Sequence, residues 1–284
     1  MKTKTKHPFT RNSLLILTAS LALLLNSTAS IADHDNFENH GIVPPQAKYR
    51  GLTYSEWAAE WFKYAFSLPL SHHPFFDTAD CSAGQAEDVW FIGGRLGGGK
   101  AERDCTVPPD TALFLPLSNA WWDNEGCDGD AIKKLGFSEA KLRSLAQADF
   151  MSTILNRHAR IIIDGLEVEG MPTNCSTASP ASCESPYRVQ TPVFDYTSPA
   201  FDSVLIPVNG SCYNDPNNNG KPYTATGAVA EGVQVMIEPL PVGKHTIQFG
   251  PPDSVTGLPR SRYNITVSKE KHEHEHEHEK RGFH

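Results

Sequence analysis

Residues 159–170, ARIIIDGLEVEG, decide the fold class. Two apolar runs flank the pair Asp164-Gly165, and both of these residue types tolerate the positive φ that a type I′ turn needs. An Asp-Gly pair between apolar runs is a strong signal for a β-hairpin. The stretch therefore predicts two antiparallel strands joined by a two-residue turn.

Outward from this hairpin, the chain repeats a pattern of short apolar runs separated by Gly, Pro and Asn turns. Further strands are predicted in residues 88–94, 111–117, 187–196, 201–208 and 261–267, and a second hairpin in 232–250, GVQVMIEPLPVGKHTIQFG. Pro116 indicates an edge strand or a bulge, because proline cannot donate a backbone hydrogen bond. The sequence thus predicts a mainly β fold, an antiparallel β-sandwich of jelly-roll or immunoglobulin-like type.

Two helices are expected to decorate this sandwich. The first is predicted in residues 52–69, where Thr53 and Glu56 have the spacing of a capping box and Pro69 ends the helical pattern. The second is predicted in residues 138–155, with Ser138 as the N-cap.

Four segments are expected along the chain. Residues 1–32 combine a basic start, a short apolar run and small residues at Ser30 and Ala32, which is typical of a cleaved signal peptide. An irregular segment, 33–50, precedes a single β-sandwich domain, 51–268, and a disordered tail rich in His and Glu, 269–284. The sequence predicts an exported protein, periplasmic or extracellular, with no stable membrane span after cleavage.

The charge of the chain excludes one class of partner. The 284 residues carry 25 Lys and Arg against 33 Asp and Glu, for a net charge of −8. Cleavage would remove four basic residues and no acidic ones, which takes the net charge from −8 to −12. Because phosphate backbones and anionic lipids demand basic patches, nucleic acid is not an expected partner.

The six cysteines indicate disulfide bonds. Their number is even, the expected compartment is oxidising, and no CxxC pair suggests structural zinc. Spacing does not determine the pairing. The predicted pairs are two local loops, Cys81–Cys105 and Cys175–Cys183, with Cys127–Cys212 left over.

The tail is the main candidate for metal binding. Residues 272–279 alternate four histidines with four glutamates. In an extended chain the histidines share one side, and in a helix they pair at i, i+4. Neutral imidazoles suit Zn²⁺, Ni²⁺ or Cu²⁺, so divalent metal ions are the expected partners. The predicted ligands are His272, His274, His276 and His278.

Calcium and nucleotide motifs are incomplete. Residues 215–220, DPNNNG, begin like an EF-hand loop, but Thr226 stands where the bidentate Glu belongs. The acidic stretch 123–130 is better explained as a solvated loop. Residues 94–101 match the spacing of a phosphate loop but place Ala101 where Ser or Thr must hold Mg²⁺. The sequence therefore disfavours both calcium and nucleotide.

Catalytic signatures are also sparse. The chain has no GxSxG and no HExxH. Histidines 72, 73, 158 and 245 could each act as a base or a ligand, but the sequence pairs none of them with a nucleophile. Trp121 and Trp122 would suit a sugar-binding face if one of them were exposed. Core packing of one and partial exposure of the other is the simpler interpretation.

Several stretches together resemble a group of exported bacterial proteins with no assigned activity. The resemblance covers about residues 50–250 and implies a single exported domain, without implying catalytic residues. The stretches are GLTYSEWAAEWFKYAFSLP, FDTADCSAGQAEDVWFIGG, CTVPPDTALFLPL, YRVQTPVFDY and VMIEPLPVGKHTIQFG.

These observations favour a non-enzymatic role. The expected protein is an exported, disulfide-stabilised binding or structural protein with a metal-binding tail. The alternative is a secreted hydrolase or carbohydrate-binding protein with its site in the loops of the sandwich.

Overall fold

A computed structural model describes the chain from residue 41 to residue 269. Within these limits it leaves out residues 77–80, 86–87, 96–98, 129–130, 155–158, 173–182 and 215–221. The described residues belong to one compact unit, Phe37–His284. The fold is mainly β, with 43% strand against 19% helix, so the prediction of a mainly β fold is confirmed.

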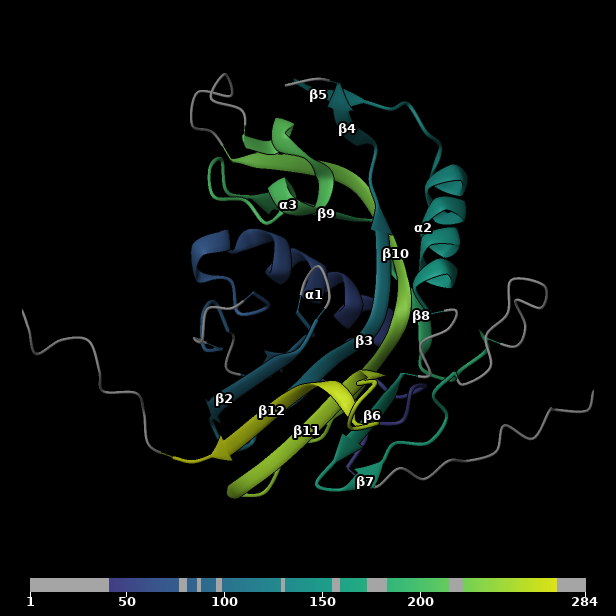
Figure 1. Ribbon diagram of the computed structural model, residues 1–284. Coiled ribbons are helices and arrows are strands. Elements are labelled where there is room, and N and C mark those ends of the chain that lie inside the picture. Colours follow the sequence, from purple (N-terminus) through teal and green to yellow (C-terminus); the bar gives the residue numbers. More distant parts are fainter. Residues whose placement is uncertain are drawn as a thin grey trace, which may run out of the picture. The chain divides into compact units, whose positions relative to one another are not determined.

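The first large sheet is centred on the long strand β10 (Figure 1). Its order is β1-β3-β10-β8, with β9 also paired to β10. The strands are β1 (Val89–Phe91), β3 (Ala112–Trp122), β8 (Arg188–Gln190), β9 (Phe194–Ser198) and β10 (Tyr223–Ile237). Every residue of β10 from Ala228 to Ile237 is buried. Such a run of buried residues shows that both faces of this strand are covered.

The second large sheet contains the last strand of the described chain. Its order is β2-β12-β11-β6-β7, and a separate small sheet pairs β4 with β5. The strands are β2 (Ala101–Val107), β6 (Arg160–Ile163), β7 (Leu166–Glu167), β11 (Gly243–Pro252) and β12 (Pro259–Val267), with β4 (Glu125–Asp128) and β5 (Ala131–Lys134) in the small sheet.

Both large sheets are mixed, so a purely antiparallel sandwich is not confirmed. Strand β1 runs parallel to β3, and β2 runs parallel to β12. Each parallel pair joins segments that no short turn connects, and the local pattern of the sequence carries no information about such pairs.

The predicted hairpin in residues 232–250 is wrong. Its two arms are the end of β10 and the start of β11, which belong to different sheets. Residues 238–242, with Pro239 and Pro241, carry the chain from one sheet to the other. Strand β11 instead pairs with β12 along most of its length. The proline-rich link is too long and too poor in N–H donors for a tight turn.

Pro116 lies beside a bulge, at a point where β3 is paired on one side only. Strand β3 pairs with β10 through a register shift between Val233 and Gln234, opposite Ser118 and Pro116. Strand β1 contacts β3 only as far as Phe114. The missing N–H of Pro116 therefore falls where β3 pairs with β10 alone and where that pairing is irregular.

Two longer helices cover the first sheet from opposite sides (Figure 1). They are α1 (Tyr54–Ser67) and α2 (Glu139–Ile154). The predicted capping box is present: the Thr53 N–H donates to the Glu56 carboxylate at 2.7 Å, and the Glu56 N–H donates to Thr53 Oγ1 at 3.3 Å. The Lys141 N–H donates to Ser138 Oγ, as predicted for the N-cap. In the part of the chain that the structure describes, no helix is long and apolar enough to cross a bilayer.

The strand predicted in residues 201–208 is wrong, because a third and shorter helix, α3 (Leu205–Asn209), stands there. The Leu205 N–H donates to Ser203 Oγ, which favours a helical turn at this point. Two short 3₁₀ turns also occur, η1 (Leu70–His72) and η3 (Ser211–Asn214).

Candidate functional site

Two of the predicted disulfides are present. Cys81–Cys105 closes a local loop, and Cys127–Cys212 joins β4 to η3. None of the described cysteines is free. Cys183 is buried, whereas Cys175 lies outside the described residues, so the pair Cys175–Cys183 stays a prediction.

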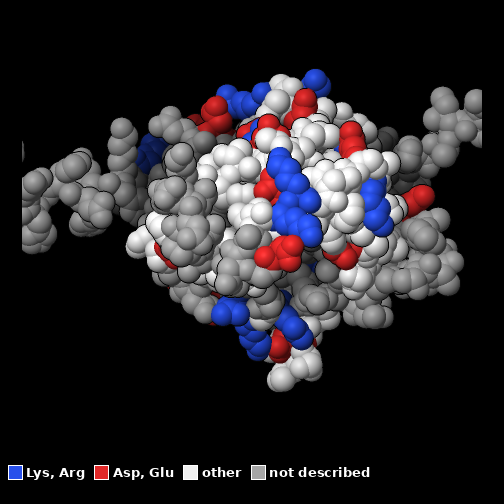
Figure 2. Space-filling view, turned by 90° about the horizontal axis from the view of Figure 1, so that it is seen from above, with Lys and Arg blue, Asp and Glu red and all other residues white. Residues whose placement is uncertain are grey.

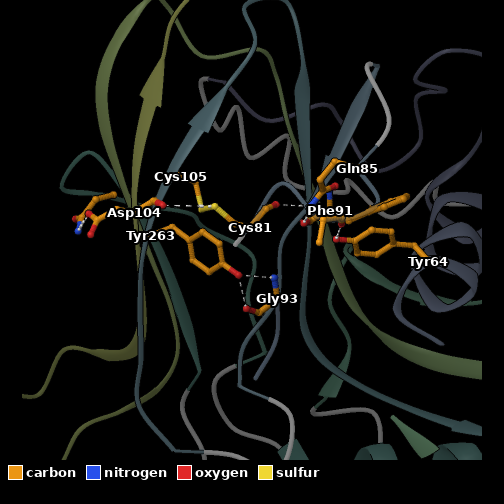
Figure 3. Close-up of a disulfide and its surroundings, with 10 residues drawn as sticks. Tyr64, Cys81, Gln85, Phe91, Gly93, Asp104, Cys105 and Tyr263 are labelled. Carbon is orange, nitrogen blue, oxygen red and sulfur yellow. Dashed lines mark hydrogen bonds between the residues drawn. A yellow bond between two sulfur atoms is a disulfide. The ribbon is translucent and has the colours of Figure 1, made fainter. Parts of the chain in front are cut away.

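The surroundings of Cys81–Cys105 connect the two sheets (Figure 3). The Tyr263 hydroxyl on β12 donates to the Gly93 carbonyl at 2.9 Å, just after β1 of the first sheet. Gln85 holds the Cys81 segment by bonding both the N–H and the carbonyl of Phe91. The disulfide then attaches this segment to β2, so the edge of the second sheet is fixed in place.

A polar pocket of about 430 Å³ opens on the outward face of the second sheet. It spans β2, β12 and β11, and the turn after β6 forms its rim. We call it the polar pocket. Its lining residues are Asp104, Cys105, Thr106, Asp164, Lys244, His245, Thr246, Asn264, Ile265 and Thr266.

Strand register explains why these side chains meet. Asn264 is paired with Asp104 on one side and with Thr246 on the other. Two residues further along β12, Thr266 is paired with Thr106 and Lys244. Successive side chains of a strand alternate between faces, so these two rows share the outward face while Ile265 and Cys105 face the core.

Part of the polar pocket is pre-oriented. The Arg262 guanidinium donates to Asn264 Oδ1 at 2.9 Å. Asn264 Nδ2 in turn donates to Asp104 Oδ1 at 2.9 Å. This chain of hydrogen bonds fixes the Asn264 amide and leaves Asp104 Oδ2 available to a ligand.

The rest of the polar pocket offers groups that can bind a ligand. Within the described residues, the side chains of Thr106, Thr246, Thr266 and Lys244 form no hydrogen bond, and Thr246 is bonded only through its backbone. Three hydroxyls can both donate and accept, and the ammonium donates. The polar pocket can therefore bind a ligand that carries both donors and acceptors.

His245 is paired with the core-facing Ile265, so its ring lies on the opposite face of β11 from Lys244 and Thr246. Its Nδ1 lies 2.6 Å from Asp164 Oδ2, and its Nε2 lies 2.8 Å from the Pro241 carbonyl oxygen. Both partners can only accept, so satisfying both requires an N–H on each ring nitrogen, which is the imidazolium form. Burial lowers the pKa of His245, but the bonds to Asp164 and Pro241 outweigh it and raise the pKa overall.

Asp164 itself is positioned by the predicted turn. Asp164 and Gly165 have φ of 49° and 85°, the positive values that a type I′ turn requires. The other Asp164 oxygen accepts from the Thr246 N–H at 2.7 Å. One carboxylate thus binds two consecutive residues of β11.

The other predicted histidines do not form a site with His245. His73 is fully buried, donates from Nε2 to the Ala65 carbonyl and accepts the Phe75 N–H at Nδ1. Burial, with a smaller contribution from the charge of Arg103, lowers its pKa to about 4 despite the bond to Ala65. His73 is therefore a neutral core residue. His72 is exposed, and His158 lies outside the described residues.

The tryptophan pair does not form a sugar-stacking surface. Trp121 packs against Phe62 and Phe66, while the Trp122 indole donates to Asp149 on α2. Both rings are partly buried.

Asp123, in the acidic stretch 123–130, is buried rather than solvated, and it accepts hydrogen bonds from the Tyr196 hydroxyl and the Glu125 N–H. Burial raises the pKa of this carboxyl, which the bonds from Tyr196 and Glu125 only partly offset. Its oxygens are engaged within the protein, so Asp123 is not placed as a calcium ligand.

No protein-family model, curated protein or solved structure matches this chain. The resemblance to exported bacterial proteins therefore stays a prediction. The assignment of a function depends on the geometry of the site alone.

The four predicted metal ligands of the tail and the calcium-like loop 215–220 lie outside the described residues. Within the described ranges, no group of three His, Cys, Asp or Glu side chains is placed to hold a metal ion. Figure 2 shows side chains of both charges interspersed on the face viewed from above, with no extended basic patch among its described residues.

Sequence reasoning missed the polar pocket. Strand β2 was not predicted at all, and Asn264, Lys244 and Thr246 were noticed only as parts of strands. The usable signal was the polar position at every second residue in AERDCTV and SRYNITV. That pattern indicates an outward face for each strand, but it does not tell which strands are neighbours.

Proposed function

We propose that this protein is an exported, disulfide-stabilised binding protein that holds a small hydroxyl-rich ligand, of the saccharide class, in the polar pocket. The observation that carries the proposal is the combination of three available hydroxyls with the pre-oriented pair Asn264 and Asp104. Such groups match the mixed donors and acceptors of a polyol.

Binding is favoured over hydrolysis by the state of His245. His245 and Asp164 resemble the general base and the orienting carboxylate of a hydrolase. However, His245 Nε2 is already bonded to the Pro241 carbonyl. A general base must present a free nitrogen within reach of the proton that it abstracts. His245 is therefore a structural cation.

The disulfides support export. Disulfides persist in oxidising compartments such as the periplasm and the extracellular medium. Two are present here, and the signal-peptide pattern of residues 1–32 agrees with them.

Isothermal titration of the disulfide-bonded protein with neutral disaccharides tests the pocket. Asp104→Ala should weaken binding about tenfold or more, since a hydrogen bond to a charged group contributes about 1.5–3 kcal/mol. Glu102→Ala is the matched control, because Glu102 lies on the same strand and the same outward face but outside the pocket lining. Equal losses in both variants, or no binding of any saccharide, would refute the proposed site.

We also propose that the tail binds divalent metal through His272, His274, His276 and His278. Both ring nitrogens of His73 and of His245 are already bonded, so these two histidines cannot ligate a metal without breaking those contacts. Phe283 is the one large apolar residue in the sequence of the tail, which is too little to repay its ordering entropy by packing.

Calorimetry with Zn²⁺ and Ni²⁺ tests the tail. Deletion of residues 269–284 should remove most of the binding and leave Tm in metal-free buffer nearly unchanged. A full-length variant with His272, His274, His276 and His278 changed to Gln should match the deletion. Affinity should fall as pH drops through about 6.5, where imidazole becomes protonated. Unchanged affinity in either variant would place the ligands in the domain.

A further inference from the structure

One carboxylate oxygen of the polar pocket is not engaged within the described part of the protein. Asp104 accepts the Asn264 amide at Oδ1, at 2.9 Å, and its Oδ2 has no partner among the described residues. Both oxygens of Asp164, the other carboxylate of the lining, accept bonds from β11, one from the Thr246 N–H and one from His245 Nδ1. A ligand that needs a carboxylate therefore finds it at Asp104.

No ion pair joins Asp104 to a cation of the described residues. Arg262 Nε donates to Asn264 Oδ1 rather than to Asp104, and Arg262 is paired across the sheet with Glu102. Lys244 lies on β11, two strands away from Asp104, with β12 between them. Two strand spacings amount to about 10 Å, so Asp104 and Lys244 mark opposite ends of the polar pocket.

Strand register places both of these charges on the outward face of the second sheet. Asp104 is paired with Asn264. Two residues further along β12, Thr266 is paired with Lys244. Side chains that are paired across a sheet share a face, and so do side chains two residues apart on one strand. The polar pocket therefore attracts a positive group of a ligand at the Asp104 end and repels it at the Lys244 end.

We propose that the ligand of the polar pocket is an amino sugar, whose protonated amine donates to Asp104 Oδ2. The inference rests on the proposed saccharide-binding function and specifies its substrate class. An ammonium that donates to a carboxylate forms a charge-assisted hydrogen bond with both partners charged, which is stronger than the bond of a hydroxyl at the same place. The net charge of −8 on the chain also favours the approach of a cationic ligand. Asp104 is thus the residue that determines specificity.

Titration calorimetry compares two disaccharides of the same linkage, one made of glucosamine and glucose and the other of two glucose units. The first carries an amine where the second carries a hydroxyl. At pH 5.5 the amino disaccharide should bind about tenfold more tightly, which is the contribution expected of a charge-assisted hydrogen bond. At pH 9 the amine has lost its proton, so this preference should shrink, while the affinity for the neutral disaccharide should change little.

Two variants at pH 5.5 locate the source of the preference. Asp104→Asn removes the charge but keeps the shape of the side chain and an oxygen that accepts a hydroxyl. It should abolish the preference for the amino disaccharide and weaken binding of the neutral one far less. Glu102→Gln is the matched control, because it makes the same change of charge on the same strand and outward face but outside the lining, and it should keep the preference.

Nuclear magnetic resonance of the side-chain amides places the ligand without any variant. Because Asn264 Nδ2 donates to Asp104, the Asn264 amide signals should shift as the amino disaccharide is added, while those of Gln85, beside Cys81, should not. Equal affinity for both disaccharides at pH 5.5, or an equal loss of preference in both variants, would overturn the amino-sugar inference alone. Failure of both disaccharides to bind, or unmoved Asn264 signals on binding, would overturn the saccharide proposal and this inference together.

Discussion

At the scale of single residues, two histidines of the same chain are held in opposite protonation states. His73 meets one acceptor and one donor in a buried site, so its neutral form satisfies both contacts. His245 meets two acceptors, so only its charged form satisfies both. The sequence shows two histidines beside turns. The difference between them depends on carbonyls and N–H groups whose positions only the fold supplies.

The charged state of His245 should make stability depend on pH. Its pKa is raised in the folded protein, so its contribution is complete below the unfolded value of about 6.5 and is lost as pH rises through the folded value. His245→Gln should lower the free energy of unfolding by about 1 kcal/mol at pH 5.5, with a smaller difference at pH 8.5. Urea unfolding at both pH values measures this. His72→Gln, at an exposed site, should show no such trend, and a constant deficit in His245→Gln would contradict the charged state.

At the scale of elements, local signals were reliable where a few neighbouring residues determine the structure. The capping box at Thr53 and the turn at Asp164 both formed as the sequence predicts. Prediction failed where the partner is distant. The arms of the supposed hairpin 232–250 separate into two sheets, and β2 pairs with β12, 160 residues further along the chain. Periodicity identifies a strand, but only the packing of the whole core decides which strands become neighbours.

One close approach between strands depends on a missing side chain. A Cβ on Gly232 of β10 would lie 2.5 Å from the Ser118 carbonyl oxygen and 2.7 Å from Asn119 Cβ, both on β3. This contact adjoins the register shift beside Val233, so β3 and β10 meet here with no space for a methyl group.

Gly232→Ala should therefore destabilise the protein by about 1–3 kcal/mol, the usual cost of overpacking. Thermal unfolding measures the change. Gly126→Ala, on β4, is the matched control. A Cβ at Gly126 would meet only the flexible end of the Leu135 side chain, at 3.4 Å. A Tm that falls no further in Gly232→Ala than in Gly126→Ala would show that β3 can move away.

At the scale of the whole molecule, the two disulfides that lie within the described residues are buried to different extents. Cys81 and Cys105 are both buried beside the contact between the sheets. Cys127 is exposed on the small β4–β5 sheet, although its partner Cys212 is buried. A reductant attacks a sulfur that it can reach, so the two bonds should differ in reactivity.

Mild reduction of the folded protein should open Cys127–Cys212 before Cys81–Cys105. Alkylation followed by peptide mass spectrometry identifies which cysteines have been released. Reduction of the protein unfolded in denaturant is the control. There the two disulfides should open together, since both bonds are then accessible. Before reduction, the unfolded protein should show no reactive thiol, and titration of any free thiol would contradict three bridges.

The parallel pairing of β2 with β12 also determines when the second sheet can form during synthesis. Strand β12 lies between β2 and β11 and is the last strand of the described chain. Strand β2 is therefore made well before β12, its only sheet partner among the described strands. Contacts between such distant segments slow folding, because a large loop must close before they form. The second sheet, and the polar pocket on it, can assemble only after β12 has been made.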